Sequence, residues 1–247
     1  MNLFDIVDID KDDIVTVVGA GGKTSLINYL AKHYQIDHKI LVTTTTKIYK
    51  PDNEFKYSMY LLDNITKATN VLLDIKNGIV VCGQYINDEE KIVGIGFEEL
   101  DRITPKFDLS LIEGDGSKRK KIKGWNNNEP VVYPSTKKTI GILDITSYDM
   151  DINEVNIHRL DELKKITNIN KNEKINFDNL CDIVLNDNGM FKNAMGENVL
   201  FINKVENTYY ENIANDLIEH IKNKNKIINK NINIVYGSIK QGIIKRG

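Results

Sequence analysis

The chain has 247 residues, of which 41% are hydrophobic and 28% charged, with a formal net charge of -2. This length and apolar share predict one large or two small globular domains with a buried core. The isoelectric point of about 6.1 gives no reason to expect nucleic acid or an anionic membrane as a partner. The acidic first residues lack a basic signal region, and no apolar run approaches the roughly 18–20 residues that span a bilayer. These features predict a cytoplasmic protein with no membrane partner.

Cysteine and histidine are sparse and scattered. Cys82 and Cys181 stand far apart, and neither belongs to a CxxC pair. A disulfide framework and a thiolate zinc site are therefore not predicted, and both residues are expected to be buried thiols. The four histidines show no metal-ligand spacing.

The first half of the chain alternates between predicted strands and helices. The run IVTVV at Ile14–Val18 is typical of a strand buried on both sheet faces. A glycine-rich turn follows it, and then a helix over Ser25–Tyr34. Further strands are predicted at Lys39–Thr43, Ser58–Leu62, Ile79–Cys82 and Asp108–Glu113, with an amphipathic segment at Ile65–Ile75.

The second half continues this alternation after a long loop, Ser117–Pro134, which is basic and then Asn-rich. Strands are predicted at Thr139–Asp144, Val199–Asn203 and Ile232–Tyr236, helices at His158–Ile166 and Tyr210–Ile221, a helix or strand at Phe177–Leu185, and a loop at Asn168–Lys174. The pattern predicts an α/β fold of three layers, P-loop NTPase-like, with a mostly parallel, doubly wound sheet. We expect a single domain over residues 1–247, with a small subdomain or insertion at about 117–175.

A candidate phosphate loop lies between the first strand and the first helix, in VVGAGGKTSL. It is shorter than GxxxxGK[ST], because Val17 stands where that motif has its first glycine. Glycines allow successive amides to converge on phosphate, and the helix N-terminus adds its dipole. A plain turn would explain the glycines but not the Lys-Thr pair behind them. The predicted contacts to ATP or GTP are Gly19, Ala20, Gly21, Gly22, Lys23, Thr24 and Ser25.

An acidic strand end followed by a basic run is the second candidate site element. Glu113 and Asp115 would bind Mg²⁺ or orient an attacking water, or they simply end a strand in an Asp-Gly turn. The basic residues after them would receive the γ-phosphate or an anionic substrate, or form a solvated loop. The predicted metal ligands are Thr24, Glu113 and Asp115. The predicted catalytic residues are Lys23, Glu113, Asp115 and Lys118.

Two further segments carry candidate substrate or partner contacts. The hydroxyls of Thr43–Thr46 would touch metal or phosphate as a nucleotide-sensing switch does, or reflect only strand propensity and capping. A His-Arg pair at the start of a helix opposes the helix dipole, so an anionic ligand or a carboxylate is expected beside it. Trp125 is expected to anchor its loop in an apolar pocket. The predicted contacts are Thr44, Thr45, Lys47, Lys123, His158 and Arg159.

The sequence Asn203-Lys204-Val205-Glu206 follows a core strand and resembles the NKxD element of GTPases, with Glu in place of Asp. A carboxylate there would accept both guanine N1–H and N2–H, while the Asn amide would meet the other edge of the ring. The alternative is a surface turn in an Asn/Lys-rich chain. Asn203, Lys204 and Glu206 are thus further candidate nucleotide contacts, and the choice between ATP and GTP stays open.

Together these motifs resemble the YqeC family, over about residues 14 to 207. The most specific piece is E-x-D-G-(S/A)-K…K…EP-V-x-P, carried by Glu113, Asp115, Gly116, Ser117, Lys118, Lys123, Glu129, Pro130, Val131 and Pro134. The family's HR pair corresponds to His158 and Arg159, and its glycine turn with lysine to Gly189 and Lys192. Gly114 and Asn188 depart from the family pattern.

The resemblance implies a P-loop protein that assists maturation of a selenium-dependent molybdenum hydroxylase, with that enzyme or its cofactor-assembly proteins as partners. The function predicted is Mg²⁺-dependent binding of a nucleoside triphosphate, with slow hydrolysis. Two alternatives stay open: an ATP-dependent ligase or kinase acting on a small acid, and a non-catalytic binder of a nucleotide or dinucleotide cofactor.

Overall fold

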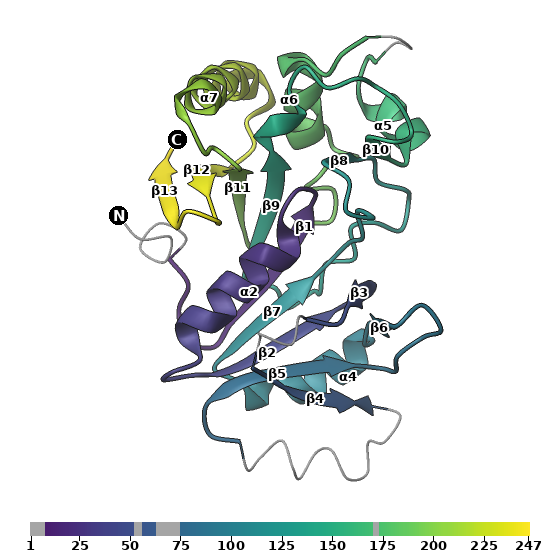
Figure 1. The fold of residues 1–247 in the computed structure, drawn as a ribbon, viewed down its shortest axis with the longest axis vertical. Helices are drawn as coiled ribbons and strands as arrows, with labels where there is room; N and C mark the ends of the chain where they lie inside the picture. The colour runs from purple at the N-terminus through teal and green to yellow at the C-terminus, as the bar shows by residue number, and fades with distance from the viewer. Residues whose placement is uncertain (1–7, 52–55, 63–74, 170–172) are drawn as a thin grey trace.

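A nine-stranded sheet forms the centre of the computed structural model, which describes residues 8–51, 56–62, 75–169 and 173–247 (Figure 1). The strand order is β13-β12-β11-β9-β1-β7-β2-β5-β4, and every neighbouring pair is parallel except β12 and β13. The strands are β1 (Asp13–Gly19), β2 (Lys39–Thr44), β4 (Ser58–Leu61), β5 (Gly78–Gly83), β7 (Leu109–Glu113), β9 (Lys138–Asp144), β11 (Glu197–Asn203), β12 (Asn233–Ser238) and β13 (Ile243–Arg246).

The described residues also form helices and two small sheets. The helices are α2 (Lys23–Tyr34), α4 (Phe97–Ile103), α5 (Leu160–Ile166), α6 (Phe177–Leu185) and α7 (Thr208–Ile228), with 3-10 turns η2 (Thr104–Lys106) and η3 (Ile145–Ser147). Antiparallel β3 (Lys47–Tyr49) and β6 (Lys91–Val93) form one small sheet. Parallel β8 (Ile122–Lys123) and β10 (Ile157–His158) form the other.

The central strands are buried on both faces because helices cover each side of the sheet. Successive residues of β11 pack in different hydrophobic clusters, because side chains along a strand point alternately to the two faces of the sheet. Val199 and Phe201 pack in the cluster that contains the buried face of α2, whereas Leu200 and Ile202 pack with α6 and α7. A third cluster joins β2 and β5 to α4. The sheet is therefore the middle of three layers (Figure 1).

Most predicted elements appear close to their expected positions, and both cysteines are free and buried as expected. Phe177–Leu185 is a helix, begun by a reciprocal cap between Asn176 and Asn179. Most of the amphipathic segment Ile65–Ile75, and residues 170–172 of the predicted loop Asn168–Lys174, lie outside the described residues. No helix in the described part of the chain is both long and apolar enough to cross a bilayer.

The helix expected at His158–Ile166 begins later than predicted. His158 belongs to β10 and pairs with Lys123 of β8. Arg159 precedes α5 in a left-handed conformation, with φ of 56°. The pairing of β10 with a strand distant in sequence overrides the helical pattern here. The predicted loop Ser117–Pro134 contains the short strand β8, and β3, β6, α4 and β13 were also not predicted.

Gly124 provides a test of the packing between β8 and α5. A Cβ atom there would lie 2.3 Å from the amide nitrogen of Leu163 and 2.6 Å from the carbonyl oxygen of Arg159, both rigid backbone. We expect Gly124→Ala to lower the free energy of unfolding by about 1–3 kcal/mol, measured by urea denaturation. Gly116→Ala is the matched control, because nothing lies within 4 Å of its added Cβ. Equal denaturation midpoints for the two variants would contradict this packing.

Candidate functional site

The site lies where the carboxyl ends of the parallel strands meet. The chain runs from β1 to β2 and the edge strand β4, returns through β5 to β7 beside β1, and then continues on the other side of β1 with β9, β11 and β12. This reversal makes β1 the switch point of the sheet, the place where open α/β sheets bind ligands. The loop after β1 therefore lies between the acidic ends of β7 and β9.

Close packing forces the loop after β1 to use glycine. Gly19, Gly21 and Gly22 have positive φ angles of 96°, 88° and 142°. A Cβ on Gly21 would lie 2.3 Å from the Cβ of Asp144, and one on Gly22 would lie 2.4 Å from Nδ2 of Asn203. The glycines thus permit both the curl of the backbone and its contact with β9 and β11.

The backbone amides of the loop divide into two groups. The Gly19 amide donates to both carboxylate oxygens of Asp115 at 3.1 Å, and the Ala20 amide donates to the Ile142 carbonyl at 3.1 Å. The amides of residues 21–24 donate no hydrogen bond to any residue in the described ranges. They stand at the N-terminus of α2, which carries no acidic residue in its first turn. Such amides, with the helix dipole behind them, favour an anion.

Lys23 is a buried ammonium inside this loop. Its Nζ donates to the Gly19 carbonyl at 2.7 Å and lies 3.2 Å from Asp115 Oδ1 and 3.8 Å from Glu113 Oε1. Burial opposes its charge, but the Asp115 and Glu113 carboxylates outweigh that effect and raise the pKa of Lys23. The positive charge is therefore held within the loop.

Glu113 and Thr24 place two oxygens side by side at the loop. The Thr24 hydroxyl donates to Glu113 Oε2 at 3.0 Å. Burial raises the pKa of Glu113, against the opposing influence of Lys23 and Thr24. In the described part of the chain, no three His, Cys, Asp or Glu side chains group as a metal centre. The pair nonetheless fits Mg²⁺, which prefers oxygen ligands and is usually bound through one or two carboxylates plus phosphates.

Asp115 is fully buried, and both of its carboxylate oxygens are bonded within the protein. Besides the Gly19 amide and Lys23, Trp125 Nε1 donates to Oδ2 at 2.7 Å, and Lys123 Nζ lies 3.0 Å from the same atom. Burial opposes the charge of Asp115, but Lys23 and Lys123 outweigh it and lower its pKa. Asp115 therefore connects the glycine loop after β1 to the chain after β7. Trp125 is buried, as expected of an anchor.

A line of alternating charges leads from Asp115 to the surface. Lys123 Nζ lies 2.8 Å from Glu129 Oε2, and Arg159 pairs with the same carboxylate. The Lys123 side chain is 0% exposed, so it lies inside this network rather than on an open substrate surface. Lys118, in contrast, is exposed and has a left-handed backbone with φ of 49°.

The threonines after β2 bond to backbone beside the loop. Thr44 Oγ1 donates to the Glu113 carbonyl at 2.7 Å, and Thr45 Oγ1 donates to the Val131 carbonyl at 2.6 Å. The Thr44 hydroxyl thus fixes the chain at Glu113, and the Thr45 hydroxyl fixes the chain at Val131. Lys47, at the start of β3, is exposed.

On the other side of the loop, β9 and β11 contribute a second polar group. Asn203 Nδ2 donates to the Gly21 carbonyl at 2.9 Å, and its Oδ1 accepts from the Ile239 amide at 3.3 Å. Lys204 Nζ lies 2.5 Å from Oδ2 of the fully buried Asp144. Sequence reasoning missed Asp144, although it ends an apolar strand just as Glu113 does. That shared pattern would have found it.

Ser25 follows Thr24 in the first turn of α2 and is exposed. The family's glycine turn lies near the loop after β8. Lys192 Nζ donates to the carbonyls of Asn126 and Asn127 at 3.3 Å and 3.1 Å. A Cβ on Gly189 would lie 2.4 Å from the Ile183 carbonyl oxygen, so this turn also needs glycine.

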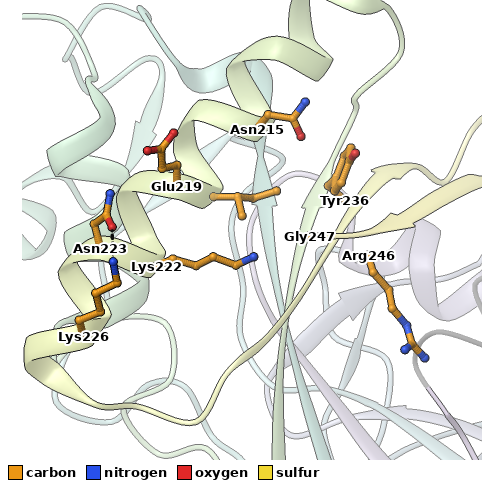
Figure 2. A pocket seen from close by; sticks show the side chains of 9 residues that line it. Asn215, Glu219, Lys222, Asn223, Lys226, Tyr236, Arg246 and Gly247 are labelled. Carbon is orange, nitrogen blue, oxygen red and sulfur yellow. Dashed lines mark hydrogen bonds between the residues drawn. The ribbon is translucent and has the colours of Figure 1, made fainter.

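Two hollows have linings that do not include the glycine loop. One, of about 450 Å³, lies between α7 and the end of the chain, where Lys222 points toward Gly247 and Arg246 points away (Figure 2). The other, of about 240 Å³, lies at the ends of β11 and β12 and is lined by residues that include Glu206, Glu211 and Gln241. The ends of β11 and β12 at the second hollow are bonded to the loop, because Asn203 donates to the Gly21 carbonyl and accepts from the Ile239 amide.

Comparison with known proteins assigns the chain to a protein family. Residues 15–161 match the family model described as YqeC protein. The chain belongs to the YqeC family. A relative from Escherichia coli (strain K12), the "Uncharacterized protein YqeC", is 28% identical over 200 residues, covering 78% of this chain and 77% of the relative. The part of the chain that matches the YqeC model holds the glycine loop and the charge network through Arg159, whereas Asn203 and Glu206 lie beyond it.

His158 gives this network a measurable pH dependence. Burial, with the charges of Lys123, Arg159 and Lys118, lowers the pKa of His158 to about 4 from its ordinary 6.5, while Glu129 opposes the shift. Below pH 6.5 the unfolded chain binds a proton that the folded chain does not, so stability falls as pH decreases from 6.5 to 4. We expect His158→Gln to flatten the free energy of unfolding over this range. The control His220→Gln, at an exposed position on α7, should keep the wild-type slope in pH-dependent urea titrations, and a wild-type slope in His158→Gln would contradict the assignment.

Proposed function

We propose that this protein binds a nucleoside triphosphate, as its Mg²⁺ complex, at the loop Gly19–Thr24. The observation that carries the proposal is that Lys23 is buried and charged inside the glycine loop. The backbone amides of residues 21–24 around it donate no hydrogen bond to any described residue. A buried ammonium and converging amides favour an anion with several oxygens. Neither feature is required of an ordinary turn between a strand and a helix.

The surrounding residues have distinct roles in this proposal. Lys23 exchanges its contact with the Gly19 carbonyl for phosphate oxygens. Thr24 and Glu113 hold the cation, which when bound neutralises phosphate charge. Asp115 positions the loop, because its oxygens already accept hydrogen bonds from the Gly19 amide and Trp125. Of the two acidic residues predicted as metal ligands, the geometry thus favours Glu113.

We propose slow hydrolysis of the bound nucleotide, with Glu113 orienting water and the exposed Lys118 countering charge on the terminal phosphate. The surface near His158 and Arg159 would receive a second anionic ligand or a partner protein. The sequence resemblance to the YqeC family supports a role for this protein as an accessory factor in the maturation of a selenium-dependent molybdenum hydroxylase. Phosphate release that requires an added small acid would favour a ligase or kinase instead, and tight binding without turnover would favour a non-catalytic binder.

Replacing Lys23 tests the proposal directly. We expect Lys23→Ala to weaken Mg²⁺-dependent binding of fluorescent ATP or GTP analogues at least tenfold, about 1.4 kcal/mol, because the ammonium no longer meets the phosphates. Lys32→Ala removes the same charge from the exposed last turn of the same helix, and should bind as wild type does. Equal affinity of Lys23→Ala and Lys32→Ala would refute the phosphate assignment.

The metal role of Glu113 predicts a different defect. We expect Glu113→Gln to reduce the gain in nucleotide affinity on adding Mg²⁺ by about tenfold, while affinity in EDTA changes little, since the neutral amide is a poorer cation ligand. Asp108→Asn is the control, because Asp108 precedes the opposite end of the same strand and bonds to the Lys39 amide. A full Mg²⁺ effect in Glu113→Gln, measured by the same titration, would exclude this role.

A further inference from the structure

The side chain of Asn203 bonds the ends of β11 and β12 to the glycine loop. Asn203 donates to the Gly21 carbonyl at 2.9 Å and accepts from the Ile239 amide at 3.3 Å. Both polar atoms of the amide are thus bonded to backbone from the two sides. These two bonds fix the distance between the loop and the segment that follows β11. An amide has a second N–H and a second oxygen lone pair, so the contact of Asn203 with a base stays a prediction.

That segment carries a carboxylate that is nearly free. Glu206 is partly buried and lines the hollow of about 240 Å³ at these strand ends. The only hydrogen bond to its carboxylate from the described residues is a long one, 3.5 Å, from the Ser238 hydroxyl. The other carboxylate of the hollow, Glu211, is paired with Lys245. Glu206 is therefore the group in this hollow with acceptor capacity to spare.

The backbone around Glu206 is fixed as well. The Val205 amide donates to the Gly237 carbonyl at 2.9 Å, and Gln241 Nε2 donates to the Glu206 carbonyl at 3.2 Å. Lys204 has a left-handed backbone with φ of 66° and is held by Asp144. A carboxylate on a rigid turn is suited to recognise a ligand by geometry, since little conformational freedom is lost on binding.

We propose that Glu206 recognises guanine, so that the nucleotide bound at the loop is a guanosine triphosphate. This inference rests on the proposed function. A carboxylate has only acceptors, and guanine offers two adjacent donors, N1–H and the N2 amino group. Adenine has an acceptor at N1 and hydrogen at C2, so it leaves the carboxylate unpaired. Two parallel charge-assisted hydrogen bonds also fix the orientation of the base.

The test uses the full chain with Mg²⁺ and three competitors of a fluorescent GTP analogue: GTP, ATP and xanthosine triphosphate. Wild type should bind GTP about tenfold or more tighter than ATP. Glu206→Gln should lose that preference and gain about tenfold for xanthosine triphosphate. The reason is that an amide donates to the C2 carbonyl of xanthine while still accepting from its N1–H.

Glu211→Gln is the matched control, since it makes the same change in the same hollow and should keep the wild-type order of the three nucleotides. Circular dichroism melts of each variant check that the comparison is between folded proteins. Equal affinity of wild type for ATP and GTP, or the same nucleotide order in both variants, overturns the guanine assignment and leaves triphosphate binding standing. Absence of binding to every nucleotide overturns the proposed function as well.

Discussion

The buried carboxylate of Asp115 is the interaction on which the candidate site depends. Removing a charge from water is unfavourable unless opposite charges and hydrogen-bond donors surround it. Asp115 meets this requirement through two lysines, an indole and the Gly19 amide. These donors come from the phosphate loop and from the chain after β7. Pairing the charge therefore fixes the position of the loop relative to that chain.

The same network connects the loop to more distant parts of the fold. Lys123 bridges Asp115 and Glu129, and Arg159 completes the line at the surface. The segment around β8 and β10 is thereby connected to Lys23 through a continuous line of paired charges.

Sheet topology explains why residues so distant in sequence meet. Eight strands of the described sheet direct their carboxyl ends to one edge, because all neighbours from β12 through β4 are parallel. Glycines then let the loop lie directly against Asp144 and Asn203. The loop thus has acidic oxygens on the β7 side and an amide with a lysine–carboxylate pair on the β9 and β11 side. In the proposed function these two sides would receive the two ends of a nucleotide, phosphate with metal at one and the base at the other.

The sequence by itself determined the local features. Apolar periodicity located most strands and helices. Gly19–Thr24 and Glu113 could be predicted as candidate site residues, because glycine conformation and charge at a strand end are local properties. Pairing between distant segments was not predictable in this way. Pairing between distant segments puts His158 in β10 and buries Lys123. It also brings Asn203 into hydrogen bonds with backbone groups and places Asp144 beside the loop. Burial and partner choice depend on which strands become neighbours, and only the tertiary structure decides that.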